Sequence, residues 1–412
     1  MPRKEGSVAG VTYEESQASL REHLAWWGLR HVESDEAYFA WQRQVFTPQE
    51  LSSFHQHIDV KRRHSGDPAA EIAFYDLTAQ PRSVPVLYSQ RYEYYLQVGA
   101  RIARHLRSAT TLLDVGCGIG ILTTFYAKQY PDCSVLGIDR SPASITLAQQ
   151  RAEELGLTNV RFECVDLDRQ DLEGRFDCLV ATHVLLQAEQ ERGLSSRDWR
   201  TFERTIDPAV QQAFEVRTGL GVKLDRLRAA CSPQGRVVLF EKARQLARRV
   251  PLQRALATRG WHLLAPTESV RYRLIEEVTD DGPLYVLGPA ALGSGLPWDE
   301  SPEPDGAVPL DFATVQRVGR KKGEPLYENH TASAQAAWQS LPNKGVIQEA
   351  TGSGANGWSL HVEWGRADRI PYLYCADTFD RRQLVVVDEG QAAELEVYYR
   401  EIAGSLRGEA GR

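Results

Sequence analysis

Short apolar runs alternate with segments of helical periodicity through the middle of the chain. The apolar runs are 111–115, 134–138, 160–165, 177–181, 236–240, 261–265 and 284–287. Runs of this length are typical of buried strands, and segments between them, such as SPASITLAQQRAEELG, repeat apolar residues at helical spacing. Strands that alternate with helices favour an α/β fold, in which helices cover both faces of a mostly parallel sheet.

The residues that precede this region carry helix signals. Leu20 and Trp27 lie on one apolar stripe of a first helix. Thr47 is placed to cap a later helix, and Glu50 completes a capping box with it. We therefore expect residues 1–84 to form a helical N-terminal cap.

The residues that follow it predict a separate small domain. The stretch 289–309 is rich in glycine, proline and acid, which is typical of a linker. Apolar and polar residues alternate over 358–364, and a hairpin is expected to turn near Asp380. An amphipathic helix follows over 391–403. The pattern predicts a β-β-β-α unit within a C-terminal α+β domain at 310–412.

The sequence LLDVGCGIG at residues 112–120 stands between the first apolar run and a helical segment. A glycine loop in this place lets backbone approach a ligand closely, because no Cβ intervenes. The dinucleotide fingerprint GxGxxG needs a third glycine where this chain has Ile121. Asp114 would repel a pyrophosphate, but it suits a ligand that carries an ammonium group. The loop therefore favours an adenosyl amino acid over a dinucleotide, and a turn without a ligand is the alternative.

Two further acids end the second and third apolar runs. Asp139 is placed to accept hydrogen bonds from both ribose hydroxyls of such a ligand. Asp166 is placed to accept from the adenine amine, with Leu167 and either Ile138 or Arg140 beside the ring. The ends of parallel strands meet at one edge of the sheet, so both acids should lie near the glycine loop. Helix capping is the alternative role for each carboxylate.

Four segments resemble, in order and spacing, the motifs of class I S-adenosylmethionine-dependent methyltransferases over about residues 85–288. They are LLDVGCGIG, VLGIDRSPASITLAQQ, VRFECVDL and FDCLVATHVLL. The resemblance implies a Rossmann-like sheet of seven strands, one of them antiparallel, and S-adenosylmethionine as methyl donor. It assigns the three loop glycines to the cofactor, Asp139 to the ribose and Asp166 to the adenine. The cofactor-binding residues expected in this way are Asp114, Gly116, Cys117, Gly118, Gly120, Asp139, Arg140, Asp166, Leu167 and Thr182.

The residues for the methyl acceptor are less clearly marked. His183 closes the fourth apolar run and could act as a general base, because an ordinary histidine pKa is near neutrality. A structural histidine is the alternative. Tyr88, Tyr92 and Tyr95 could cover the methionine end of the cofactor or line the substrate site, or else pack in a helix. The long segment 187–222 is expected to cover the substrate.

The composition of the chain argues against several classes of binding partner. A net charge of −7 argues against a nucleic-acid or anionic-membrane surface. None of the six cysteines lies at CxxC spacing, which predicts reduced thiols in a cytoplasmic protein. The histidines of HQHIDVKRRH lack a carboxylate–histidine pattern, so we expect no metal. No apolar stretch reaches 18 residues, so no membrane span is expected.

The sequence thus predicts a methyltransferase that acts on a small-molecule acceptor. A peptide or protein methyltransferase that grips its substrate with the C-terminal domain is the alternative, and a binding module without catalysis is a third. ATHVLL stands where enzymes that methylate glutamine or base amino groups carry an Asn/Asp-Pro-Pro motif, which disfavours those acceptors. A homodimer is compatible with the sequence.

Overall fold

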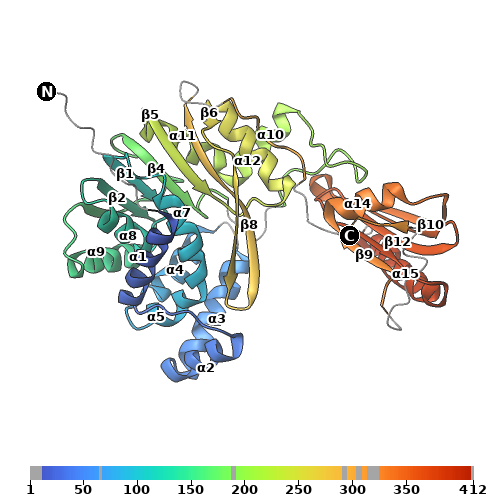
Figure 1. Cartoon of the computed structure of the whole chain (residues 1–412), viewed down its shortest axis with the longest axis horizontal. Coiled ribbons are helices and arrows are strands. Elements are labelled where there is room, and N and C mark those ends of the chain that lie inside the picture. Colours follow the sequence, from blue (N-terminus) through green and yellow to red (C-terminus); the bar gives the residue numbers. More distant parts are fainter. Residues whose placement is uncertain are drawn as a thin grey trace. The chain divides into compact units, whose positions relative to one another are not determined.

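The computed structural model describes residues 12–64, 67–186, 192–289, 295–302, 309–312 and 324–409. The chain forms two compact units, whose elements are labelled in Figure 1. The first unit comprises residues 1–191, 215–244 and 254–298. The second unit comprises residues 192–214, 245–253 and 299–412. The stretch expected to be a linker, 289–309, lies partly outside the described residues.

A twisted sheet forms the centre of the first unit. Its strands are β1 (Thr111–Val115), β2 (Ser134–Asp139), β3 (Val160–Cys164), β4 (Phe176–Thr182), β5 (Cys231–Phe240), β6 (Trp261–Leu263), β7 (Glu268–Leu274) and β8 (Glu277–Pro289). Seven of them lie in the order β3-β2-β1-β4-β5-β8-β6. Strands β1 to β5 are parallel, and β8 is antiparallel to both of its neighbours. The predicted α/β class and the single antiparallel strand in this row are confirmed.

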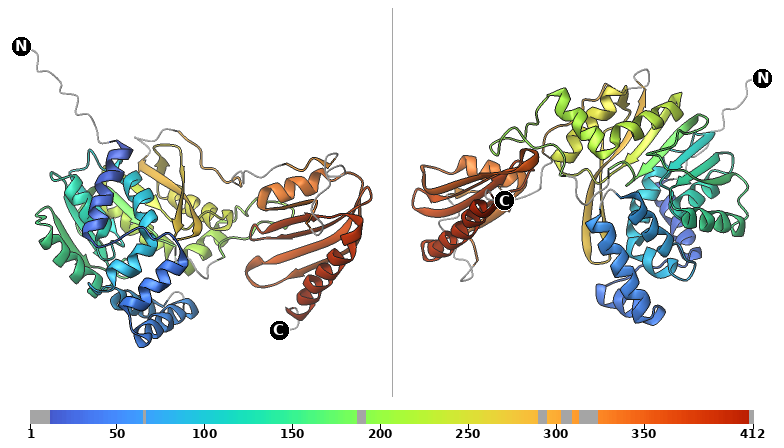
Figure 2. Two further views of the ribbon diagram at one scale, coloured as in Figure 1. Left: turned by 60° about the horizontal axis from the view of Figure 1, so that its bottom comes forward. Right: turned by 180° about the vertical axis from the view of Figure 1, so that it is seen from behind.

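Strand β7 was not predicted from the sequence. It pairs with the first half of β8, and the two form a long hairpin beyond the rest of the sheet (Figure 2). Its sequence, ESVRYRL, alternates polar and apolar residues, and Val270 and Tyr272 are the buried ones. The alternation spans few residues and contains two arginines, so its signal is weaker than that of the apolar central strands.

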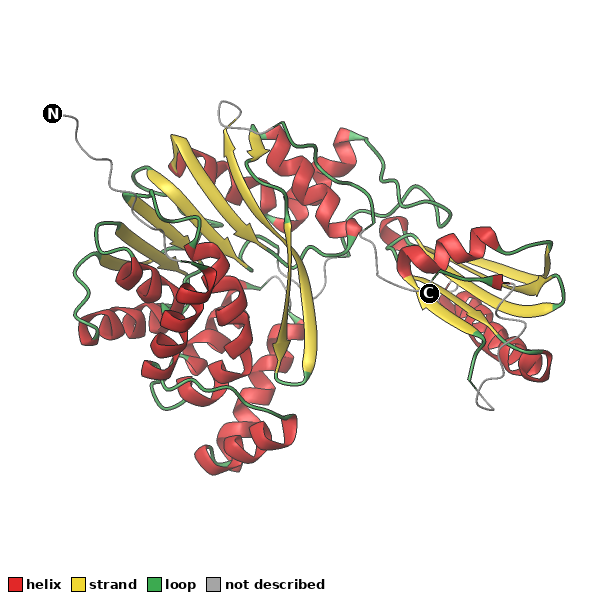
Figure 3. Ribbon diagram, in the orientation of Figure 1, coloured by secondary structure: helices red, strands yellow, loops and turns green. Residues whose placement is uncertain are grey.

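Helices lie on both sides of this sheet (Figure 3). Helices α8 (Ile121–Gln129) and α9 (Pro142–Glu154) connect β1 to β2 and β2 to β3. Helix α11 (Leu220–Ala230) precedes β5 and connects in the opposite direction across the sheet. Because crossovers between parallel strands are right-handed, the reversal of direction at β1 places α11 on the other face from α8 and α9. The reversal also opens a crevice beside β1, where open α/β sheets bind ligands.

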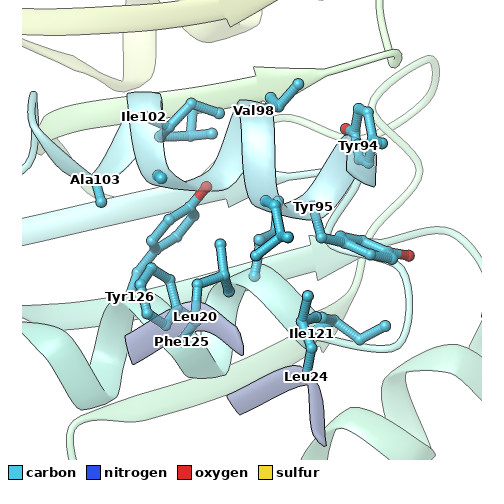
Figure 4. Packing of buried hydrophobic residues seen from close by; sticks show 14 of the residues in the cluster. Leu20, Leu24, Tyr94, Tyr95, Val98, Ile102, Ala103, Ile121, Phe125 and Tyr126 are labelled. Carbon is cyan, nitrogen blue, oxygen red and sulfur yellow. The ribbon is translucent and has the colours of Figure 1, made fainter. Parts of the chain in front are cut away.

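The N-terminal helices are α1 (Tyr13–Trp26), α2 (Asp35–Val45), α3 (Pro48–Arg63), α4 (Pro68–Thr78), α5 (Val84–Leu87), η1 (Tyr88–Arg91), α6 (Tyr92–Tyr94), η2 (Tyr95–Gly99) and α7 (Ala100–Ala103). Of these helices, α1 packs on α8 and α4 on α9, and α2 and α3 pack on α5 and α4. Capping boxes start α1 at Thr12 and α3 at Thr47, and the second is the one that the sequence predicted. Leu20 and Leu24 of α1 meet Phe125 of α8 in a dry core (Figure 4). This core holds η1, α6 and η2 at the edge of the sheet where β1 ends.

The second unit contains an antiparallel sheet of five strands. Its elements are β9 (Tyr327–His330), α14 (Thr331–Ser340), β10 (Lys344–Ser353), β11 (Ser359–Ala367), β12 (Ile370–Asp377), β13 (Arg382–Val386) and α15 (Ala392–Glu409). The strand order is β10-β11-β12-β13-β9. Helix α14 packs on one face and α15 on the other. The predicted β-β-β-α unit was therefore incomplete, since β9, α14 and β10 were missed. Strand β10 is an exposed edge, so it lacks the apolar alternation that reveals a half-buried strand.

The segment 192–214 belongs with this second unit. The Trp199 ring stacks on His361, with 3.7 Å between the centroids and 2° between the planes. Arg204 forms a buried ion pair with Asp380. The sequence predicts that the segment 187–222 covers the substrate. Residues 187–191 of this segment lie outside the described residues, and 192–214 belong to the second unit. In the part of the chain that the structure describes, no helix has the length and apolarity needed to cross a membrane.

Candidate functional site

The glycine loop after β1 is shaped by left-handed backbone angles. Gly116 has φ 71°, and a Cβ added there would lie 2.2 Å from Cγ2 of Val184. Gly118 has φ 53°, but a Cβ added there would meet no atom within 4 Å. Both angles favour glycine over other residues. Gly116 is therefore required by packing, whereas Gly118 turns a bare backbone toward open space that a ligand can occupy.

Asp139, at the end of β2, holds this loop from the side. Its Oδ2 accepts a hydrogen bond from the Gly118 N–H at 2.9 Å, and its Oδ1 accepts one from the Ser141 N–H at 2.9 Å. Burial raises the pKa of Asp139, and the hydrogen bonds from these backbone groups oppose the shift. A carboxylate has about four lone-pair sites, so Asp139 keeps capacity to accept from a ligand.

Asp114, inside β1, lies beneath the loop. It is only 4% exposed, and the Thr123 hydroxyl donates to its Oδ2 at 2.6 Å. Burial raises the pKa of this carboxyl to about 7. A buried carboxylate without a cation is costly, so a positively charged ligand group nearby would be stabilised by its ionised form.

Asp166 and Arg140 border the site on the β3 side. The Oδ1 of Asp166 accepts from the Asp168 N–H at 3.0 Å, and its Oδ2 lies 3.5 Å from the Arg169 guanidinium. Arg140 forms an ion pair with Glu71 of α4. Leu167, an apolar residue, lines the cavity together with these two charged residues.

One cavity collects most of the residues expected at the cofactor site. It encloses about 1250 Å³ of empty space, including the part open to solvent. The predicted residues that line it are Tyr88, Tyr95, Asp114, Gly116, Cys117, Gly118, Asp139, Arg140, Asp166, Leu167, Thr182 and His183. Two predicted residues lie elsewhere. Gly120 faces Ala148 and Phe162 in the packing between α8, α9 and β3, and Tyr92 sets its ring edge-on against His31.

Comparison with known proteins agrees with this geometry. Residues 106–217 match the family model described as a methyltransferase domain. Residues 106–217 are therefore similar to a methyltransferase domain. The domain is 31% identical over 101 residues to malonyl-[acyl-carrier protein] O-methyltransferase of Acetivibrio thermocellus, covering 23% of this chain and 35% of that protein. It is also 30% identical over 103 residues to the release factor glutamine methyltransferase of Escherichia coli, covering 24% and 37%.

A plant enzyme is similar to the methyltransferase domain over a shorter stretch. The (S)-tetrahydroprotoberberine N-methyltransferase of Eschscholzia californica is 32% identical over 80 residues, covering 19% of this chain and 23% of that protein. The chain thus spans less than two-fifths of the length of these relatives. Among solved structures, the N-methyltransferase NodS from Bradyrhizobium japonicum is 16% identical, with a TM-score of 0.33 over 50% of this chain and 88% of that one.

At the end of β4, the methyltransferase domain places His183 between two charged side chains. Its Nδ1 lies 3.0 Å from Nη2 of Arg91, and its Nε2 lies 3.0 Å from Oδ2 of Asp281. Arg91 can only donate, so Nδ1 carries the lone pair and Nε2 carries the proton of a neutral ring. Burial lowers the pKa of His183 to about 4 despite the Asp281 carboxylate.

The loop after His183 is held by a residue that the sequence analysis missed. Glu241, which follows β5, is fully buried. Its Oε1 accepts from the N–H groups of Val184 and Leu185 at 2.8 Å each, and its Oε2 accepts from the Leu186 N–H at 3.4 Å. Burial raises the pKa of Glu241 to about 7. An acid directly after the apolar end of β5, Val237–Phe240, was the available signal, because such an acid lies at the same sheet edge as Asp139.

Arg91 and Asp281 were also missed. Arg91 comes from η1 and Asp281 from β8, so neither belongs to a motif near the glycine loop. Asp281 also accepts a hydrogen bond from the Tyr272 hydroxyl of β7. Although burial raises it, the pKa of Asp281 is lowered on balance by its hydrogen bonds from His183 and Tyr272. The hairpin β7–β8 therefore supplies part of the site.

Proposed function

We propose that this chain is an S-adenosylmethionine-dependent methyltransferase that transfers a methyl group to a small-molecule acceptor. The main observation that supports this proposal is the backbone of Gly118, which faces open space. The same cavity is lined by the carboxylates of Asp114, Asp139 and Asp166. A bare loop beside three acids fits an adenosine ligand with an ammonium group. It does not fit a pyrophosphate, which the acids would repel.

The residues of the cavity would hold the cofactor in the following way. The loop at Gly116 and Gly118 would receive the methionine end, with Asp114 beneath its ammonium. Asp139 would accept from the ribose hydroxyls through lone pairs not used by Gly118 and Ser141. Asp166 would accept from the adenine amine, and Leu167 would pack on the ring.

S-adenosylmethionine would supply an electrophilic methyl group on a sulfonium. The chain's own part is to hold an acceptor in line with that methyl and to exclude water, which by itself accounts for much of the rate in such transfers. The neutral His183 offers the lone pair of Nδ1, which would accept a proton from the acceptor once Arg91 moves off it. Its low pKa makes it a weak base, so positioning is the larger contribution.

A second cavity supports a small acceptor. It shares Tyr75, Tyr88, Arg91 and His183 with the cofactor cavity, and residues of α3 and α4 line its far side. With about 1530 Å³ of empty space, counting the part open to solvent, it is large enough for a compact molecule beside the cofactor.

A protein acceptor is the second candidate function. It is favoured by the similarity to a release factor glutamine methyltransferase and by the separate second unit, which could grip a polypeptide. The residues after β4, ATHVLL, speak against glutamine itself.

The proposal is tested by calorimetric titration of the full chain with S-adenosylmethionine and S-adenosylhomocysteine, followed by incubation of cell extract with the protein and an isotope-labelled methyl donor. We expect binding of both ligands and a labelled small molecule. A labelled polypeptide would favour the second candidate, and binding without any labelled product would favour a module without catalysis. Failure of both ligands to bind would overturn the proposal.

We also propose that the protein acts in the cytoplasm. All six cysteines are free thiols in the structure, which suits a reducing compartment. Fluorescence microscopy of a tagged full-length chain tests this, and a signal in another compartment would contradict it.

A further inference from the structure

Arg91 lies where the two cavities meet. Its side chain is half-buried at the end of η1 and lines both cavities. The guanidinium carbon lies 4.2 Å from the centre of the Tyr94 ring, and Nη2 lies 3.0 Å from His183. Among the described residues, no carboxylate forms an ion pair with it. A cation that is partly withdrawn from water is stabilised by an anionic partner, so Arg91 is placed for an anion that arrives with a ligand.

The second cavity has an excess of positive charge. Lys61, Arg62 and Lys242 line it together with Arg91. Its two carboxylates already have partners in the protein. Asp67 accepts a hydrogen bond from the Ala69 N–H, and Glu71 forms an ion pair with Arg140. In the lining, Lys61, Arg62, Lys242 and Arg91 outnumber these two carboxylates, which favours a negatively charged ligand.

The positive charge lies on the acceptor side of the site. Lys61, Arg62 and Lys242 line the second cavity and not the first, whereas the loop residues 114–119 line the first and not the second. Beside the polar residues His64, Thr78 and Gln90, the second cavity wall is mostly apolar or aromatic. Its residues of this kind are Phe74, Tyr75, Leu87, Tyr88, Leu186, Tyr272 and Leu274.

We propose that the methyl acceptor is an anion with a flat apolar body, and that Arg91 binds its carboxylate or phosphate group. This inference rests on the proposed methyltransferase function. A guanidinium carries five N–H donors in a planar fork, so Arg91 can hold two acceptor oxygens, and turning toward them would free the lone pair of His183 Nδ1. The bound anion would thereby be fixed beside the end of β4, within reach of the cofactor cavity.

The test uses the full chain and three small probes of equal ring size: benzoate, phenyl phosphate and benzyl alcohol. Thermal unfolding and calorimetric titration are run with and without saturating S-adenosylhomocysteine. We expect benzoate or phenyl phosphate to bind and raise Tm, and benzyl alcohol to bind at least tenfold more weakly. The tighter of the two anions identifies the group on the acceptor as a carboxylate or a phosphate.

Variants then assign the anion to Arg91. Arg91→Gln should weaken binding of the anionic probe at least tenfold and change the Kd of S-adenosylhomocysteine less than threefold. Arg82→Gln, an exposed arginine outside both cavities, is the matched control and should change neither. If Arg91→Gln does not fold, Lys242→Gln carries the test and should weaken the probe severalfold.

The inference is overturned if benzyl alcohol binds as well as the anions, if no probe binds, or if Arg91→Gln weakens S-adenosylhomocysteine as much as the probe. The last result would assign the guanidinium to the carboxylate of the cofactor. If the proposed methyltransferase function itself is wrong, the experiments give a different result. The wild type would then not bind S-adenosylhomocysteine, while the Arg91-dependent binding of the anion would persist in its absence.

Discussion

The Gly118 N–H donates a hydrogen bond to Asp139 across 2.9 Å and so ties the glycine loop to the end of the neighbouring strand. One carboxylate thus shapes the loop before any ligand binds. This relationship gives Asp139 two separable roles, one in stability and one in the binding of a ribose.

We predict that Asp139→Ala lowers both the stability of the fold and the affinity for S-adenosylhomocysteine. Loss of a half-buried acceptor for two backbone N–H groups should reduce the free energy of unfolding by about 1 kcal/mol. The Kd for S-adenosylhomocysteine should rise at least tenfold, measured by calorimetric titration. Asp171→Ala is the control, because this acid is 91% exposed and pairs with Arg226 outside the cavity. A Kd within threefold of wild type in Asp139→Ala would remove the ribose role.

A second prediction compares two glycines with similar backbones. Gly118 and Gly174 both have positive φ, at 53° and 86°, and neither has an atom within 4 Å of an added Cβ. Alanine should cost each variant about 1 kcal/mol of stability, measured by denaturant unfolding, because both positions hold a left-handed backbone. Only Gly118→Ala should also lose S-adenosylhomocysteine binding, because its methyl group would enter the cofactor cavity. Equal ligand affinity in the two variants would contradict this placement of the cofactor.

The residues of the site that could be predicted from the sequence are those that belong to local motifs. Asp139 and Gly118 belong to motifs at strand ends, and parallel strands bring their ends together whatever the loops do. Arg91 and His183 are 92 residues apart, and they meet only through the irregular helical turns between Tyr88 and Gly99. The partner of His183 on its other side, Asp281, is placed by the register of β8 with β5, which no short pattern reveals.

The same argument applies to the second unit. The strong alternation of β11 predicted a strand correctly, because its neighbours on both sides leave it half-buried or more. The edge strand β10 is mostly exposed and polar, so its pairing with β11 is decided by backbone hydrogen bonds that carry no side-chain pattern. Helix α14 is short and rich in alanine, and its buried residues are two alanines and the polar Gln335, which give no apolar stripe.

The third prediction is a pH dependence that arises from Asp114. Burial raises its pKa to about 7 in the folded chain, well above its ordinary value of 3.8. The folded state therefore holds this proton more tightly than the unfolded state, and its contribution to stability falls as the pH rises from about 4 to about 7. The pH dependence of ligand binding has the opposite sign to that of stability, because only the ionised carboxylate attracts an ammonium group. The affinity for S-adenosylhomocysteine should increase from pH 5.5 to pH 7.5.

Asp114→Asn separates these effects. Titrations at several pH values should show a nearly flat affinity in this variant over the same range. The fall in stability should become shallower without vanishing, because Glu241 also has a pKa raised to about 7 and titrates in the same window. If the wild-type affinity does not change with pH, Asp114 does not lie beneath the ammonium.

The last prediction concerns Glu241, which holds the loop after β4. Glu241→Gln keeps the size of the side chain but turns an NH₂ group toward backbone N–H donors at Val184 to Leu186. The free energy of unfolding should fall by about 1–3 kcal/mol, because at least one buried donor loses its partner. Hydrogen exchange should accelerate at least tenfold at these three amides.

The effect of Glu241→Gln should also reach the glycine loop, because Val184 packs against Gly116. It should therefore weaken S-adenosylhomocysteine binding, by a smaller factor than Asp139→Ala does. Glu173→Gln, at an exposed position, should leave exchange and binding unchanged. Unchanged protection of residues 184–186 in Glu241→Gln would show that the loop is held by its packing and not by the carboxylate.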